Sequence, residues 1–145
     1  MTGTGAAAAL RFTHCSLAVN DLDAAVGFYS GAFGCTPAFR EDGITGLIES
    51  VAGQHGLTCD LAILNVPGTE VLLELIAFRD PGAAVDHRPP GGHVEFSVGV
   101  LEESMAAVER LGARRVGAVT EFPEGPSVYY TEPGGSVFEL TEYRS

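Results

Sequence analysis

The sequence is poor in basic residues. It contains 8 Lys+Arg against 19 Asp+Glu, which gives a formal net charge of −11 and a pI near 4.6. A chain with this charge repels phosphate backbones and anionic lipid surfaces. We therefore expect neither nucleic acid nor a membrane among its partners.

Cysteines are few, and long apolar runs are absent. Cys15, Cys35 and Cys59 cannot all pair within one chain, and none stands in a Cys-x-x-Cys spacing, which indicates reduced thiols in the cytosol. No apolar run approaches the roughly 20 residues that a membrane span needs. The opening MTGTGAAAAL has no basic segment before its small residues and meets Arg11 too early for a signal peptide. We expect a cytoplasmic protein.

The chain nevertheless has enough apolar residues to bury a core. With 145 residues, 46% of them hydrophobic, it fits one compact domain over residues 10–145, preceded by a flexible tail at 1–9. Residues 79–92, RDPGAAVDHRPPGG, are rich in Pro and Gly and have no hydrophobic period. We interpret them as a linker between module one, residues 10–78, and module two, residues 93–145.

The two modules open on similar sequences. Residues 12–34, FTHCSLAVNDLDAAVGFYSGAFG, and residues 91–113, GGHVEFSVGVLEESMAAVERLGA, each set a histidine before a strand-like run and a helix-like segment. Aligned without gaps from His14 on His93, they share the pairs Val19 and Val98, Leu22 and Leu101, and Asp23 and Glu102. The sequence therefore indicates a duplicated unit.

Local patterns predict the elements of each module. Residues 14–19 alternate as a strand does, and residues 22–33 have apolar residues at helical spacing, with Asn20 or Asp21 as the N-cap and Gly34 as the stop. Further strands are predicted at the following ranges: 44–50, 58–66, 70–78, 93–100, and two strands around the EPGG turn within 127–143. A second helix is predicted over 101–113. Together with the duplication, we interpret each module as β-α-β-β-β.

A histidine and a glutamate stand at corresponding positions in both modules. His14 and Glu74 lie on the first and last strands of module one, and His93 and Glu139 lie on those of module two. Both glutamates have apolar neighbours, so their burial is costly without a partner. If the modules pack about a pseudo-twofold axis, the four side chains converge. Two imidazoles and two carboxylates suit one divalent ion, namely Zn²⁺, Fe²⁺, Mn²⁺, Co²⁺ or Ni²⁺.

Four stretches, HCSLAVNDLDAAVGFYSGAFG, VLLELIAF, GGHVEFSV and VYYTEPGGSVFELTEY, resemble the vicinal oxygen chelate superfamily. This superfamily includes glyoxalase I, methylmalonyl-CoA epimerase, extradiol dioxygenases, and fosfomycin and bleomycin resistance proteins. The resemblance covers about residues 10 to 143. It implies an α+β fold, in which two tandem βαβββ modules form an open, U-shaped mixed β-barrel with flanking helices. It also implies a homodimer, with His14, Glu74, His93 and Glu139 as ligands of one divalent metal ion.

The resemblance implies a metal-dependent isomerase, epimerase or lyase that acts on a small carbonyl substrate through a metal-stabilised enolate. The catalytic candidates are Glu74, Glu139 and Glu95. Glu74 would be a ligand that detaches and acts as the base, and Glu139 would stay on the metal. Glu95 shares a strand face with His93 and would be a second proton carrier, with a water-exposed rim residue as the alternative.

The sequence departs from particular relatives. Ala18 and Phe78 stand where the resemblance to bacterial glyoxalase I implies a glutathione-binding arginine and asparagine, which argues against glutathione. The second proton-transfer glutamate of methylmalonyl-CoA epimerase falls near Gly46, with Glu49 the nearest carboxylate. Two alternatives therefore stay open. One is an extradiol-type Fe(II) dioxygenase, although Glu74 would occupy one of its open metal positions, and the other is a non-catalytic protein that binds a drug or metabolite.

Three tyrosines and two further histidines are additional polar candidates for the site. Tyr129, Tyr130 and Tyr143 are candidates for a hydrogen bond to substrate, but packing is the expected role for at least two of them. His55 and His87 stand in loops without a partner at ligand spacing, and we interpret both as solvent-exposed.

Overall fold

A computed structural model of the protein describes residues 10–79 and 92–144. Module one contains β1 (His14–Ala18), α2 (Leu22–Phe33), β2 (Thr36–Ile44), α3 (Leu47–Ala52), β3 (Cys59–Asn65) and β4 (Leu72–Phe78). Module two contains β5 (His93–Ser97), α4 (Leu101–Arg110), β6 (Arg114–Arg115), β7 (Thr120–Phe122), β8 (Gly125–Thr131) and β9 (Val137–Thr141). The tail predicted at 1–9 and residues 80–91 of the predicted linker lie outside the described residues.

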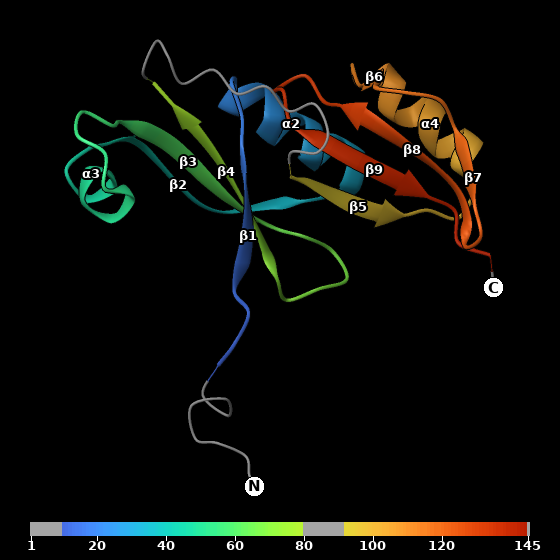
Figure 1. The fold of residues 1–145 in the computed structure, drawn as a ribbon, viewed down its shortest axis with the longest axis horizontal. Coiled ribbons are helices and arrows are strands. Elements are labelled where there is room, and N and C mark those ends of the chain that lie inside the picture. Colours follow the sequence, from blue (N-terminus) through green and yellow to red (C-terminus); the bar gives the residue numbers. More distant parts are fainter. Residues whose placement is uncertain (1–9, 80–91, 145) are drawn as a thin grey trace, which may run out of the picture.

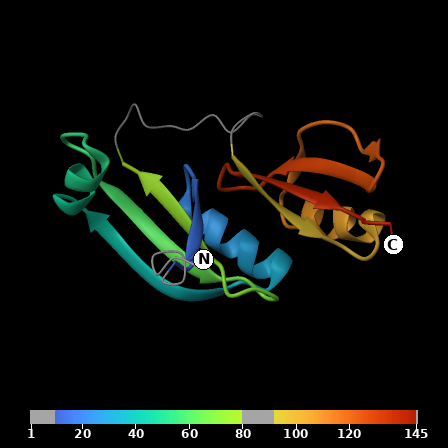
Figure 2. The ribbon, with the colours of Figure 1, turned by 60° about the horizontal axis from the view of Figure 1, so that its bottom comes forward.

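The two modules have the same sheet topology. Sheet one has the order β1-β4-β3-β2, and sheet two has the order β5-β9-β8-β6 with β7 beside β8. In both sheets the first strand pairs in parallel with the last strand, and the other pairs are antiparallel. The sheets lie side by side, with α2 and α4 behind them in the view of Figure 1 (Figures 1 and 2). The predicted α+β fold of two βαβββ modules is confirmed, and both sheets stay open in the part of the chain that the structure describes.

Helix α2 begins and ends where the sequence predicts. The Asp21 side chain accepts a hydrogen bond from the Ala24 amide at 3.0 Å, which satisfies one of the free donors of the first turn. Gly34 closes the helix with φ 71°, a conformation that glycine adopts without steric strain. The helix buries Leu22, Ala25, Phe28 and Tyr29.

The strand predicted at residues 44–50 is wrong. Strand β2 runs over Thr36–Ile44, and helix α3 follows at Leu47–Ala52. Strand β2 is exposed along nearly all of its length, so its sequence has no hydrophobic alternation that predicts it. The helix forms because Gly46 turns the chain with φ 47° and the Glu49 carboxylate accepts hydrogen bonds from the amides of Gly46 and Gly56.

The modules share one hydrophobic core, built around the aromatic residues of α2. Phe33 stacks on Phe96 of β5 with ring centroids 3.7 Å apart, and Phe28 packs on Phe138 of β9 at 5.2 Å. The Tyr29 hydroxyl lies 2.8 Å from the Ser136 hydroxyl in a buried hydrogen bond. Helix α2 therefore belongs to module one but is packed on both sheets, which fixes the two sheets relative to each other.

The EPGG turn between β8 and β9 docks on the start of α2. The Gly134 carbonyl accepts hydrogen bonds from the amides of Asn20 and Asp21 at 2.9 and 3.3 Å. A Cβ atom at Gly134 would lie 2.5 Å from the Ala25 Cβ and 2.7 Å from the Asp21 carbonyl oxygen. Only glycine fits this close approach.

We expect Gly134→Ala to destabilise the protein by about 1–3 kcal/mol, because the new methyl group forces the turn away from α2. Urea unfolding followed by circular dichroism measures this change. Gly99→Ala is the matched control, since nothing lies within 4 Å of its added Cβ, and its effect should stay below about 0.5 kcal/mol. Equal stability of the two variants would contradict the docking described here.

The same turn buries a carboxyl group. Glu132 is 2% exposed, and burial raises its pKa to about 7. The hydroxyl and amide of Ser136 approach the carboxyl and lower the pKa in part, but neither oxygen has a hydrogen bond of ordinary geometry among the described residues. The neutral, protonated form is therefore the one that suits this site.

We expect stability to fall as the pH rises from about 4.5 to about 7. The folded protein holds the Glu132 proton more tightly than the unfolded chain does. This proton therefore contributes about 3 kcal/mol to the free energy of unfolding below pH 4.5, and the contribution is lost as the pH rises to 7 and above. Glu132→Gln should remove this pH dependence and be more stable than wild type at pH 8, whereas the exposed Glu103→Gln should change neither. A wild-type slope that persists in Glu132→Gln would rule out this carboxyl as its source.

Candidate functional site

Strands β1 and β4 bring His14 and Glu74 together on the open face of sheet one. The two strands are parallel, and Ser16 of β1 lies opposite Glu74. Because Leu17 and Leu75 are buried toward α2, strand alternation turns the polar residues to the face away from that helix. The His14 Nε2 atom lies 3.9 Å from the Glu74 Oε2 atom, and the Ser16 hydroxyl donates to Oε1 at 2.9 Å.

Strands β5 and β9 repeat this arrangement in sheet two. The His93 Nε2 atom lies 3.1 Å from the Glu139 Oε1 atom. The Ser127 hydroxyl of β8 donates a short hydrogen bond to the other carboxylate oxygen. The Tyr129 ring lies beside the imidazole, with centroids 4.8 Å apart. The side chains of His93 and Glu139 are 31% and 16% exposed, so the pair is open on one side.

Glu95 lies opposite Glu139 on the same face of sheet two. Its two carboxylate oxygens accept hydrogen bonds from the Thr141 hydroxyl at 3.0 Å and from the Tyr143 hydroxyl at 2.5 Å. The bond to Glu95 raises the pKa of Tyr143 to about 12. Tyr130 is fully buried and donates to Glu109, so of the three tyrosines only Tyr129 stands directly beside a predicted ligand.

One chain therefore contains two histidine-glutamate pairs, one on the open face of each sheet. Over residues 10–79 and 92–144, no three His, Cys, Asp or Glu side chains are grouped closely enough to hold a metal ion. The structure brings His14 to Glu74 and His93 to Glu139, but it does not gather all four side chains within one chain.

The surroundings of the two pairs differ, and the sequence did not reveal this difference. Ile63 lies opposite Glu74 in sheet one, and Tyr129 lies opposite Glu139 in sheet two. The next pair on the same face is Leu61 with Ile76 in sheet one and Ser127 with Thr141 in sheet two. Glu139 thus has hydroxyl groups around it, whereas Glu74 has aliphatic neighbours. A single sequence does not fix strand register. The strand alternation of these residues therefore could not predict that they lie beside the two glutamates.

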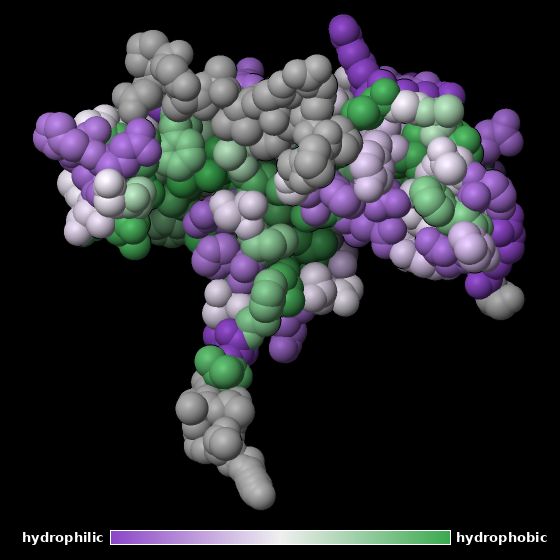
Figure 3. Space-filling model, in the orientation of Figure 1, coloured by the Kyte–Doolittle hydropathy of each residue, from purple (hydrophilic) through white to green (hydrophobic). Residues whose placement is uncertain are grey.

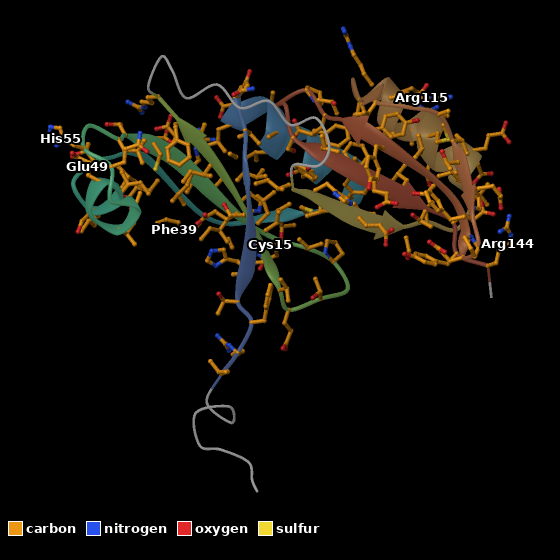
Figure 4. All side chains as sticks on the ribbon, in the orientation of Figure 1. Cys15, Phe39, Glu49, His55, Arg115 and Arg144 are labelled. Atoms are coloured by element: carbon orange, nitrogen blue, oxygen red, sulfur yellow. The ribbon has the colours of Figure 1, made fainter. Side chains whose placement is uncertain are left out.

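Glu49 is the carboxylate nearest to Gly46, where the resemblance to methylmalonyl-CoA epimerase would put a second proton-transfer glutamate. In this structure its carboxylate has a structural role instead. It closes the loop at α3, because it accepts hydrogen bonds from the Gly46 and Gly56 amides and lies 3.1 Å from the His55 ring. The Gly56 amide is the main reason that the pKa of Glu49 is lowered. Glu49 and His55 lie at α3, far from β1 (Figure 4). His55 is solvent-exposed as predicted, and His87 lies outside the described residues.

Comparisons with known proteins agree with this architecture. A family profile described as Glyoxalase/Bleomycin resistance protein/Dioxygenase superfamily matches residues 11–140. A glyoxalase family protein from Bacillus cereus is similar in structure with a TM-score of 0.75 and 25% sequence identity, over 94% of this chain and 95% of that chain. No curated protein matches the chain.

Two further solved structures share the fold at lower identity. The fosfomycin resistance protein FosX from Listeria monocytogenes, complexed with Mn(II) and a sulfate ion, has a TM-score of 0.63 and 17% identity, with 92% of this chain and 93% of that chain covered. A glyoxylase/bleomycin resistance protein/dioxygenase domain from Frankia has a TM-score of 0.61 and 21% identity, with 99% of both chains covered.

None of the described helices is long and apolar enough to cross a bilayer.

Proposed function

Because the chain belongs to the glyoxalase/bleomycin resistance protein/dioxygenase superfamily, we propose that it is a metal-dependent isomerase, epimerase or lyase of the glyoxalase type. Its substrate would be a small carbonyl compound. The observation that carries this proposal is the histidine-glutamate pair made once in each sheet at equivalent positions. The Mn(II) present in the structure of the similar protein FosX supports a divalent metal.

The residues present fit such an ion. His14, Glu74, His93 and Glu139 would hold it, since two imidazoles and two carboxylates form a donor set that Zn²⁺, Fe²⁺, Mn²⁺, Co²⁺ and Ni²⁺ accept. All four are on sheet faces that the helices leave open, and the carboxylate side chains of Glu74 and Glu139 are only 17% and 16% exposed, which favours neutralisation by a partner. A bound ion would polarise the substrate carbonyl and stabilise the enolate.

The two glutamates are held differently, which supports different roles. Glu139 contacts His93 at 3.1 Å and accepts a short hydrogen bond from Ser127, so it is the better fixed ligand. Glu74 accepts one hydrogen bond from Ser16 and stands 3.9 Å from His14. Glu74 is therefore the carboxylate that can turn toward substrate, take a proton from the carbon beside the carbonyl and return it to a neighbouring carbon.

Glu95 stays a candidate for the second proton carrier. It is two residues from His93 on the same strand face, and hydrogen bonds from Thr141 and Tyr143 hold both of its oxygens. In an epimerisation, where Glu74 takes the proton from one face of the carbon, Glu95 would give a proton to the other face, and both carboxyl groups would then exchange protons with water. The two hydroxyls would keep Glu95 in position.

We further propose that two chains complete the site. Each chain has one pair in each sheet, and the described residues of a single chain contain no larger group of metal-binding side chains. In a twofold dimer, His14 and Glu74 of one subunit would meet His93 and Glu139 of the partner subunit, and symmetry would create two such centres.

Glu74→Gln should lower proton exchange at the substrate by at least about a hundredfold, because the amide cannot act as the base. The measurement is deuterium incorporation from D₂O into small carbonyl compounds, starting with dihydroxyacetone, by protein loaded with Mn(II). Glu70→Gln, a change at an exposed residue just before β4, is the control. If deuterium exchange survives in Glu74→Gln, Glu74 is not the base. Oxygen uptake with catechol would instead favour the dioxygenase alternative.

Mixing two inactive variants tests the shared site. His14→Ala and His93→Ala should each lose tight Mn(II) binding, because every site of either homodimer lacks one ligand. A heterodimer of the two has one site with both changes and one site with none, so random exchange of subunits should restore about a quarter of the wild-type metal content. Metal content after mixing and gel filtration gives the answer. No recovery, despite proven subunit exchange, would mean that one chain supplies all four ligands.

A further inference from the structure

An apolar groove lies on module one between α3 and the edge of sheet one. It has a volume of about 470 Å³ and is lined by Ile44, Leu47, Ile48, Ser50, Val51 and Leu61. None of these side chains carries a charge. Figure 3 shows hydrophobic side chains gathered over β3 and β4 beside α3.

Helix α3 turns its larger apolar residues into this groove instead of into the core. Leu47 and Val51 are 80% and 82% exposed, yet they stand one helical turn apart and both line the groove. Single exposed leucines are common on proteins, but exposed apolar residues gathered around one open groove are typical of an interaction surface.

The groove is continuous with the face that carries Glu74. Leu61, on the floor of the groove, pairs with Ile76, and the next residue of β3 on the same face, Ile63, pairs with Glu74. Diagonal neighbours of this kind are about 7–8 Å apart in a sheet. A ring or a short alkyl chain attached to a group held at Glu74 therefore reaches the groove.

Charge on this part of the molecule disfavours anions. The chain has no lysine. Arg40 of β2 forms an ion pair with Asp23, and Arg79, directly after β4, forms one with Asp60. Glu41 of β2 lies opposite Leu61, at the side of the groove. Among the described residues around the groove, a phosphonate or carboxylate would thus meet the Glu41 carboxylate and no unpaired cation.

We propose that this groove binds an apolar, uncharged substituent of the substrate. The substituent would be an aryl or short alkyl group on the carbonyl carbon, whose oxygen binds the metal. The inference rests on the proposed function, because the metal-binding end of the ligand is held at Glu74. It adds the chemical class of the substrate: a carbonyl compound with a hydrophobic body and no second anionic group.

Hydroxamic acids with different substituents test this specificity, since each offers the same pair of oxygens to a metal. Acetohydroxamic, benzohydroxamic and 4-carboxybenzohydroxamic acids would be titrated calorimetrically into protein loaded with Mn(II). Benzohydroxamic acid should bind at least about tenfold more tightly than either of the others, because its ring leaves water without carrying a charge into the groove. Equal affinities, or tightest binding of the carboxylated compound, would overturn the proposal.

A double variant, Leu47→Gln with Val51→Gln, locates the effect. Both side chains are exposed, so the fold should survive, and the preference for the ring should disappear while the affinity for acetohydroxamic acid stays the same. Val100→Gln, a change at an exposed apolar residue of module two, should keep the preference. If the double variant keeps the ring preference but dissociates the dimer in sedimentation, the groove is covered by a second copy of the chain and the proposal is wrong.

A measurement without metal separates this inference from the proposed function. Benzyl alcohol added to metal-free protein should shift the backbone amide resonances of Leu47, Val51 and Leu61 in a nitrogen-proton correlation spectrum. If those shifts occur but no hydroxamic acid binds protein treated with Mn(II), the metal centre fails while the groove stands. If the hydroxamic acids bind but the amides do not shift, the groove fails while the metal centre stands.

Discussion

The contact between an imidazole and a carboxylate on neighbouring parallel strands, made once in each sheet, is the interaction on which this account depends. It arises because the first and last strands of a module pair in parallel and each strand alternates between a buried face and an open face. Leucine and phenylalanine side chains fill the helix side, so His14 and Glu74, or His93 and Glu139, are left together on the other side. The same alternation that builds the core thus assembles the polar pairs.

Much of this arrangement is predictable from the sequence, for identifiable reasons. Helix α2 has a clear hydrophobic period, a capping aspartate and a terminating glycine, and the duplication fixes which strands correspond. Strand β2 and helix α3 were missed because β2 is exposed and carries no alternating pattern. The roles of Ser127 and Thr141 depend on strand register, which one sequence does not determine. The failure of the four predicted ligands to converge within one chain depends on how α2 packs between the modules, and this is a property of the tertiary structure alone.

The two modules have kept the same topology but differ in chemistry. Sheet two surrounds its carboxylate with hydroxyl groups, and the Ser127 hydroxyl donates a short hydrogen bond to Glu139. Sheet one gives Glu74 a single hydroxyl and a run of aliphatic neighbours that continues into the groove under α3. A duplicated fold thereby supplies one fixed carboxylate and one carboxylate with freedom to move beside an apolar surface. This division would suit the proposed reaction, in which Glu139 stays on the metal while Glu74 also serves as the base.

The most direct test of the central claim is the anomalous diffraction of manganese in crystals of the protein grown with Mn(II). The account predicts one strong peak per chain, bonded to His14 and Glu74 of one subunit and to His93 and Glu139 of the partner subunit. A peak bonded to other residues, or no peak while the four side chains point into solvent, would contradict it.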